Sequence, residues 1–433
     1  MKRLIFFAWL LIPFSGIAQE ELTLEEAIAL ALENNYDIRL VEKDVAIAEN
    51  NVSIGNAGML PSVSADVSSA AGIQNTTQTL LSGENRTVRG NRTRSGAYGA
   101  SLDWTIFDGL QMFTRYEQLK ELKVLGDANL KAAILATVSD VVSSYFDLVQ
   151  QQQLIKATQT ALDLSAFRYQ TAENRYKIGR ASKLEVLAAS VDLNTDTTNL
   201  LRQRDQYKST QIRLNELLAR DVNTDFTVAD TIIIGNDLQY EVLSQQALSL
   251  NPTLQATIVN HRIAELELKR VKGERYPVVN VSSAYTRSQS RTQLGFSTES
   301  KSNGFSYGIS ASMNIFDGFR QRRNEQNAAF AADAAAIAVD QTRQRIEAQL
   351  LAAYETYQMY LELVRLEERN KEIAQQNMDI TLEKFKLGSI APLEFREAQR
   401  NFVDASARFS TAQYQAKLAE VTLNQIAGTL KMK

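Results

Sequence analysis

The stretch "SYGISASMNIFDG" at residues 306–318 decides the fold, because the stretch "AYGASLDWTIFDG" at residues 97–109 repeats its pattern. The two align without a gap at an offset of 209 residues (306 − 97 = 209). Apolar residues such as Tyr307, Ile309 and Ile315 alternate with small polar residues. Strict alternation predicts a β-strand with one apolar and one polar face. Each of these strands ends in the same four residues, "IFDG".

The repetition extends to both sides of these strands. "YKIGRASKLEV" at 176–186 and "FKLGSIAPLEF" at 385–395 keep the offset (385 − 176 = 209), whereas Pro61 and Pro277 pair at 216 (277 − 61 = 216). Self-similarity along nearly the whole chain indicates a duplicated structural unit. The expected divisions are a first repeat at 19–220, a linker at 221–237 with one short strand near 232–234, a second repeat at 238–428 and a tail at 429–433.

Each repeat is predicted to contain the same elements in the same order. An opening helix leads to a β-hairpin with a long polar loop, followed by a long helix and a returning helix. A helix of about 68 residues is roughly 100 Å long, and no compact domain holds that length. The expected ranges are 23–56 and 238–272 for the opening helices, 61–107 and 277–316 for the hairpins, 74–94 and 287–304 for their loops, 110–177 and 319–387 for the long helices, and 182–219 and 392–427 for the returning helices.

Short glycine-containing motifs mark the turns of the chain. Asp108 and Gly109 directly follow a strand in the first repeat, as Asp317 and Gly318 do in the second. We expect the aspartate to cap the long helix that begins there. At the other end of each long helix stand Gly179 and Gly388, in the position where glycine commonly ends a helix.

The first 18 residues have the composition of a cleaved secretory signal. Lys2 and Arg3 precede an apolar run, and the small residues Gly16 and Ala18 follow it. A short membrane anchor is the alternative, but the run is shorter than the ~20 residues of a spanning helix. Since no later apolar window approaches that length, we expect strands rather than helices to cross any membrane.

Composition excludes several classes of function. With 47 basic and 50 acidic residues, the net charge of -3 gives no overall attraction to nucleic acid. The chain has no cysteine, so disulfides, thiolate sites and acylated cysteines are absent. His261 is the one histidine and stands within a predicted helix. We therefore expect no enzyme activity, no metal site and no cofactor.

The four predicted strands cannot close a barrel within one chain, because the edges of the sheet would stay unpaired. Two copies would give eight strands, and three would give twelve, which leaves a lumen. A water-soluble sandwich shows the same alternation, but it does not account for the long helices. The arginines in the first loop fit either contact with anionic lipid head groups or a solvated loop: Arg86, Arg89, Arg92 and Arg94.

The duplicated order of elements, with "F-D-G" after the second strand and "Y-x-x-G" or "F-x-x-G" at the helical turn, resembles the TolC family of outer-membrane efflux proteins. The resemblance implies a mixed α and β membrane protein that forms a homotrimer. Its β-barrel of four strands per subunit would lie in outer-membrane lipid, and its long antiparallel helical hairpins would form an α-barrel across the periplasm. Such a duct works with a periplasmic adaptor protein and an inner-membrane RND or ABC-type pump, in efflux or type I secretion. A trimeric stalk without a conducting lumen, structural or adhesive, is the alternative.

The resemblance also implies roles for residues at the helical turns. The tip that docks on the adaptor would be formed by Tyr176, Gly179, Arg180, Phe385 and Gly388. The acidic positions that line the closed aperture of the family would be Glu185, Glu394 and Glu397.

Two of these glutamates also have a plain structural explanation. "SKLE" at 182–185 fits a capping box around Glu185, and Glu394 would favour a helix N-terminus electrostatically. The sequence departs from the family at Phe385, which lacks the hydroxyl of the tyrosine often found there, and at Ile390, where an arginine is common. Arg180 or Arg396 would have to replace that arginine.

Overall fold

The computed structural model describes residues 20–235, 238–293 and 297–429, so the expected signal segment at 1–18 lies outside the described residues. The chain forms two compact units. One is built from the segments up to residue 41, from 131 to 252 and from 344 onward, and the other from residues 42–130 and 253–343. Each unit therefore combines parts of both repeats.

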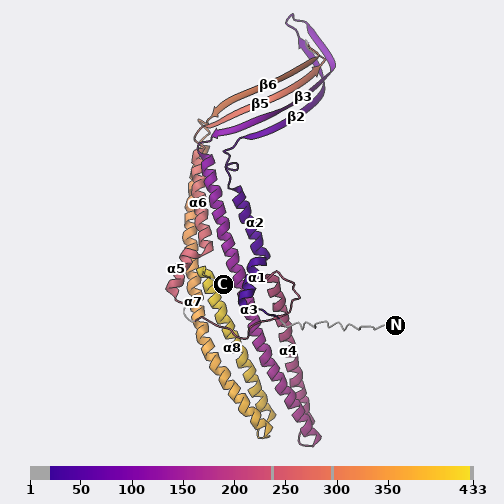
Figure 1. Cartoon of the computed structure of the whole chain (residues 1–433), viewed down its shortest axis with the longest axis vertical. Coiled ribbons are helices and arrows are strands. Elements are labelled where there is room, and N and C mark those ends of the chain that lie inside the picture. The colour runs from indigo at the N-terminus through magenta and orange to yellow at the C-terminus, as the bar shows by residue number, and fades with distance from the viewer. Residues whose placement is uncertain (1–19, 236–237, 294–296, 430–433) are drawn as a thin grey trace, which may run out of the picture. The chain divides into compact units, whose positions relative to one another are not determined.

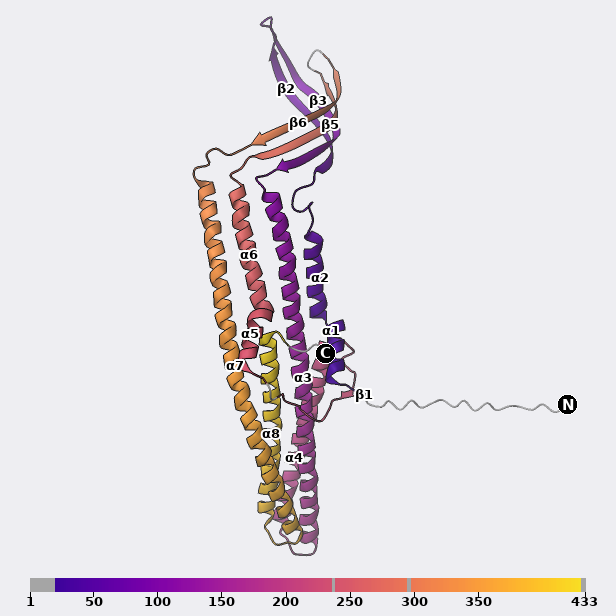
Figure 2. The ribbon, with the colours of Figure 1, turned by 60° about the vertical axis from the view of Figure 1, so that its left-hand side comes forward.

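A single antiparallel sheet lies in the second unit, and Figures 1 and 2 show its strands side by side. The strands are β2 (Ser62–Thr79), β3 (Asn85–Phe107), β5 (Val278–Thr292) and β6 (Glu299–Ser312), in the order β2-β3-β5-β6. The hairpin of each repeat is present, and the pairing of β3 with β5 joins them. β2 and β6 are the edges of this sheet.

The strands continue beyond the apolar alternation, so the expected loops at 74–94 and 287–304 are wrong in their lengths. Thr77 pairs with Thr87 and Arg291 with Glu299, within segments expected to be loops. Backbone pairing does not require apolar side chains, and these polar pairs simply extend the ladder. The alternation of faces is as expected: Trp104 pairs with Val281 on one face, while the Ser64 and Ser101 hydroxyls hydrogen-bond at 2.9 Å on the other.

The eight described helices are α1 (Leu24–Asn34), α2 (Tyr36–Asn51), α3 (Gln111–Lys177), α4 (Lys183–Leu217), α5 (Tyr240–Leu250), α6 (Pro252–Gly273), α7 (Arg320–Lys386) and α8 (Pro392–Ala427). Both long helices are present, at 67 residues each. The returning helices lie beside them in the first unit, α4 beside α3 and α8 beside α7 (Figure 2). Gln151 of α3, for example, donates to the Thr210 hydroxyl of α4 at 2.9 Å.

Each opening helix is broken in two, which contradicts the prediction of one continuous helix per repeat. The breaks fall at Asn35 and Asn251. The amide of Asn35 donates to the Leu217 carbonyl, and the amide of Asn251 donates to the Ile426 carbonyl, both at 2.9 Å. Each asparagine thus satisfies a carbonyl in the last turn of a returning helix, where no intrahelical donor is available.

The expected strand at 232–234 is also wrong. The short strand of this region is β4 (Phe226–Thr227), which pairs in parallel with β1 (Glu20–Glu21). Phe226 is almost completely buried, whereas Ile233 is exposed, so burial selects the earlier segment for pairing.

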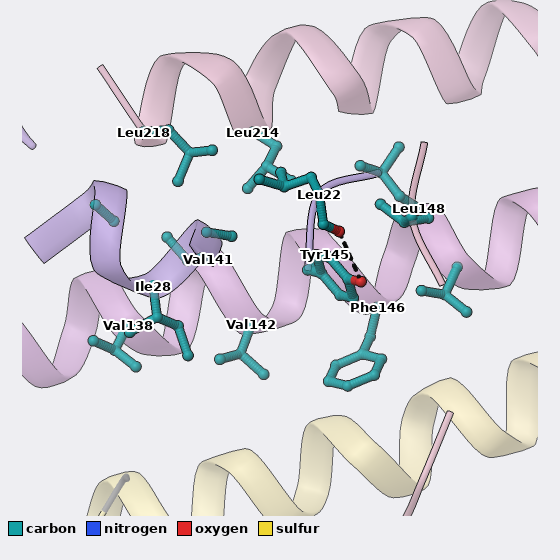
Figure 3. Close-up of a cluster of buried hydrophobic side chains, with 14 of the residues drawn as sticks. Leu22, Ile28, Val138, Val141, Val142, Tyr145, Phe146, Leu148, Leu214 and Leu218 are labelled. Carbon is teal, nitrogen blue, oxygen red and sulfur yellow. Dashed lines mark hydrogen bonds between the residues drawn. The ribbon is translucent and has the colours of Figure 1, made fainter. Parts of the chain in front are cut away.

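The main apolar core of the first unit surrounds α3, and Figure 3 shows it at Tyr145. The cluster joins residues of three helices, among them Val141 of α3, Ile28 of α1 and Leu214 of α4. The Tyr145 hydroxyl donates to the Leu22 carbonyl at 3.1 Å and accepts from the Ala229 N–H at 3.3 Å. α3 also contains one window apolar enough to span a membrane, contrary to expectation, but 61% of it is buried inside the protein, as in a core helix.

Candidate functional site at the helical tip

The two long helices end in the same way. At the end of α3 the Gly179 N–H donates to the Tyr176 carbonyl at 2.9 Å, and the Arg180 N–H donates to the Arg175 carbonyl at 2.7 Å. At the end of α7 the Gly388 N–H donates to the Phe385 carbonyl at 3.0 Å. This arrangement is the Schellman motif, and it needs a left-handed residue. Glycine supplies that conformation, at φ 73° for Gly179 and 71° for Gly388.

Phe385 is a packing residue of the tip. Its ring is 3% exposed and stacks on Phe395 of α8, with the centroids 5.0 Å apart. Phe167 of α3 contacts it edge-on at 6.4 Å, and the Arg175 guanidinium lies over it at 5.5 Å. One ring therefore joins the helical hairpins of both repeats, and this position requires no hydroxyl.

An ion cluster, which sequence reasoning missed, lines the same hollow as Phe385. Arg168 of α3 and Asp192 of α4 pair at 2.7 Å, with side chains 6% and 8% exposed. Arg396 of α8 reaches the other oxygen of Asp192 at 2.9 Å. Burial of Arg168 and Asp192 is tolerable because these two charges neutralise each other, whereas Arg396 is partly exposed. Asp192 continues the three-residue spacing of the buried residues Val186 and Ala189. This spacing could have indicated from the sequence that its carboxylate is buried.

Gln399 extends this cluster from the second repeat to the first. Its side-chain amide donates to the Ala161 carbonyl at 2.8 Å and to the Ser165 hydroxyl at 2.9 Å. The tip is therefore held together by polar contacts as well as by Phe385.

The three candidate aperture glutamates have different surroundings. Glu185 lines a hollow of about 310 Å³ together with Asp192 and Arg396. Its backbone N–H donates to the Ser182 hydroxyl oxygen at 3.3 Å, which is one half of the expected capping box. Glu394 and Glu397 are exposed on α8 and form no ion pair within the described part of the chain. The structure thus brings Glu185 toward the ion cluster and leaves the other two carboxylates facing solvent.

The other expected tip residues lie on the surface. Tyr176 is exposed, with the Lys183 ammonium 5.4 Å from its ring centroid. Arg180 is exposed and contributes its backbone N–H to the turn. Of the two arginines considered as replacements for the family arginine, Arg396 is the one engaged in an ion pair. Within the part of the chain that the structure describes, no group of side chains is suited to a metal ion.

The strand-to-helix turns lie in the second unit and match each other closely. The Asp108 carboxylate accepts the Met112 N–H at 3.0 Å, and the Asp317 carboxylate accepts the Gln321 N–H at 2.9 Å. The aspartates therefore cap the long helices as the sequence predicts, although those helices begin at Gln111 and Arg320, later than expected.

Comparison with known proteins gives consistent results. The family model described as outer membrane efflux protein matches residues 27–220 and 243–429. Outer membrane efflux protein BepC of Brucella suis biovar 1 (strain 1330) is 21% identical over 96% of this chain and 87% of its own. Nodulation protein T of Rhizobium leguminosarum bv. viciae is 23% identical over 93% and 81%.

Solved structures share the fold. The CmeC outer membrane channel of Campylobacter jejuni has a TM-score of 0.79 at 16% identity and covers 94% of this chain and 86% of its own. The open state of the MtrE outer membrane channel of Neisseria gonorrhoeae has a TM-score of 0.72 at 14% identity, over 94% and 90%.

Proposed function

The chain belongs to the outer membrane efflux protein family, and we propose that it is the duct of a tripartite system in which an inner-membrane pump delivers substrates for efflux or type I secretion. The predicted membership of the TolC family and the mixed α and β fold are confirmed. The protein is an efflux channel of the outer membrane that extends into the periplasm, and it is not an enzyme.

The duct is proposed to be a homotrimer. β2 and β6 are the edges of the four-stranded sheet, and pairing between three copies would close a twelve-stranded barrel without free edges. An apolar stripe along α7 and the residue that follows it recurs every seven residues and is 49–82% exposed in the single chain. This is the pattern of a helix that packs on a partner helix. The stripe consists of Met359, Leu366, Ile373, Ile380 and Leu387.

A periplasmic adaptor protein is proposed to dock on the helical tip, and an RND or ABC-type pump would join it from the inner membrane. Tyr176, Gly179 and Arg180 are exposed at one turn and Gly388 at the other, which supports a docking role for both turns. The substrate would be selected by the pump.

The proposed preference of the aperture for cations rests on Glu394 and Glu397. Both carboxylates are exposed next to the turn at Gly388 and are free of ion pairs with the described residues. A trimer would repeat them three times around its axis, and a ring of carboxylates favours cations. Glu185 would contribute less, because it lies in the hollow beside Arg396.

Single-channel recording of the purified oligomer in a planar bilayer tests this function. We expect a small conductance that prefers cations, and we expect Glu394→Gln with Glu397→Gln to weaken that preference. Glu383→Gln is the matched control, because Glu383 is an exposed glutamate near the same turn but is paired with Lys386 at 2.6 Å. Unchanged selectivity in the double variant would rule out the aperture assignment.

A stalk without a lumen would give a different result. Verified inserted oligomers would then be silent, both as wild type and as the double variant. Silence of the wild type alone, with conduction by the double variant, would instead show a duct sealed at its tip.

A further inference from the structure

We propose that the outward face of the β-sheet carries a binding site for the phosphorylated headgroup of an outer-leaflet glycolipid of the lipid A type. The site is a hollow of about 420 Å³ whose lining includes Arg94, Arg287, Arg291 and Lys301. The inference rests on the outer-membrane location of the sheet, and it adds a lipid partner at defined residues.

Strand register places these four cations on the apolar face. Arg94 pairs with Arg291, and Arg291 pairs with Glu299, so their side chains share one side of the sheet. Arg287 pairs with Tyr98, and Lys301 pairs with Gln289, at even spacings from that row. Since side chains at even spacings in a strand point the same way, all four cations lie on the side of Tyr98.

The same face is apolar nearer to the helices. Its apolar residues on β5 and β6 are Val281, Tyr285, Tyr307 and Ile309. The side chain of Tyr307 is 83% exposed and that of Ile309 is 70% exposed. In an outer-membrane protein, an exposed apolar face contacts lipid, and aromatic residues mark its boundary with the headgroups. The basic residues follow directly after the aromatic ones, and therefore stand at headgroup level.

The order of the elements along the chain determines the membrane leaflet at which the basic residues lie. α3 follows β3 and α7 follows β6, and the helices extend into the periplasm. The opposite strand ends, where the basic residues lie, therefore face the cell exterior. The outer leaflet there is built of glycolipid whose phosphate groups are anionic, which complements a basic surface.

The hollow has a floor of small residues and an excess of positive charge. Gly96 and Ser69 are paired across β3 and β2 and leave space between the longer side chains. Glu299 neutralises part of the charge, at 3.2 Å from Arg291 and 3.3 Å from Lys301. Arg94 and Arg287 form no ion pair with any residue that the structure describes, so their guanidinium groups are available to a phosphate, which they bind in bidentate geometry.

The test measures retention of bis-phosphorylated lipid A by the full-length oligomer in detergent, using native mass spectrometry. We expect Arg94→Gln, Arg287→Gln and Lys301→Gln combined to weaken binding on the order of 100-fold, from the loss of three charges near an anionic headgroup. Gly96→Leu should weaken it several-fold by filling the floor without changing the charge. Arg86→Gln with Arg89→Gln is the control, because neither arginine lines the hollow.

Three outcomes would overturn the proposal. These are full retention by the triple variant, equal binding of lipid A from which the phosphates have been removed, and displacement by millimolar inorganic phosphate, which would indicate a simple anion site. Bilayer conductance of the same triple variant separates this proposal from the channel function. It should equal that of the wild type, whereas silence of both the wild type and the variant with Glu394→Gln and Glu397→Gln would contradict the function itself.

Discussion

The glycines of the two strand-to-helix turns, Gly109 and Gly318, have different surroundings. A Cβ added to Gly109 would lie 2.2 Å from the Gly273 carbonyl oxygen and 2.9 Å from Cβ of Tyr276. A Cβ on Gly318 would meet nothing within 4 Å. Both glycines have positive φ, at 73° and 67°. The first position is therefore constrained by backbone conformation and by packing, and the second by conformation alone.

We predict that Gly109→Ala destabilises the protein more than Gly318→Ala does. The second substitution should cost about 1–2 kcal/mol, the usual penalty of a left-handed non-glycine residue. The first should cost at least ~2 kcal/mol more, because the backbone of Gly273 must move to accept the methyl group. The midpoint of thermal loss of helical circular dichroism measures both, and equal midpoints would contradict the packing argument.

Glu325 makes the stability of the second unit depend on pH. Hydrogen bonds from the Arg275 guanidinium and then from Gln321 lower the pKa of this carboxyl, despite an opposing effect of burial. A lowered pKa in the folded state means that the unfolded chain binds the proton more readily. The stabilisation is therefore present above the ordinary glutamate pKa, near 4, and is lost as the pH falls through the folded value.

Glu325→Gln should accordingly lower the unfolding midpoint at pH 7 and have a much smaller effect near pH 3. The measurement is the difference between variant and wild-type melting midpoints across that range. Glu347→Gln is the control, because Glu347 is exposed on the same helix and forms no ion pair with the described residues. A difference for Glu325→Gln that stayed constant with pH would show that the charge is not responsible.

At the level of elements, the sequence predicts strands and long helices well but misses the helix breaks. The spacing of apolar residues continues across Asn35 and Asn251. Such spacing does not reveal a single residue whose backbone is not helical. The cause is a side chain that bonds backbone groups: Asn35 accepts the N–H groups of Asp37 and Ile38 at 2.9 and 3.2 Å. Pro252 was a usable signal for the second break, since it disfavours helix at the residue before it.

The tip could be located from sequence, but its internal contacts could not. Glycine spacing identifies both turns, whereas the partners of Phe385 and Asp192 come from helices far apart in the chain. Periodicity says which side of a helix is buried, not which helix covers it. The ion cluster therefore becomes visible only in the folded chain.

Asp192 is the residue on which this cluster depends. Asp192→Asn would leave Arg168 buried without a counter-charge, and we expect a loss of about 3–5 kcal/mol at the tip. Arg168→Met with Asp192→Leu should be milder, because no buried charge then remains. Hydrogen exchange of the α3 and α4 ends is the measurement. Glu173→Gln serves as control, since the side chains of its pair with Lys177 are 32% and 62% exposed. An equal loss in the double variant would argue against the charge explanation.

At the level of the whole molecule, the two sequence repeats and the two compact units divide the chain at different residues. Each repeat contributes a hairpin to the sheet. To the first unit it contributes the first half of its opening helix, the end of its long helix and its returning helix. The repeats are joined by the pairing of β3 with β5 and by the ring of Phe385. The sequence predicted the doubled elements because each repeat carries the full pattern. It left open their assembly, because pairing between repeats has no periodic signal.

The apolar stripe of α7 gives the test of assembly. Ile380 is 58% exposed in the single chain, so an aspartate there costs the monomer little. In a trimer that buries the stripe, the same carboxylate would be desolvated without a partner, at several kcal/mol in each of three copies. We therefore expect Ile380→Asp to dissociate the detergent-solubilised oligomer, measured by light scattering, while its helical signal persists. Gln375→Asp adds the same charge five residues earlier, on the side of the helix away from the stripe, and should leave the oligomer intact. If both variants stayed trimeric, the interface between copies would have to lie on another face of the helices.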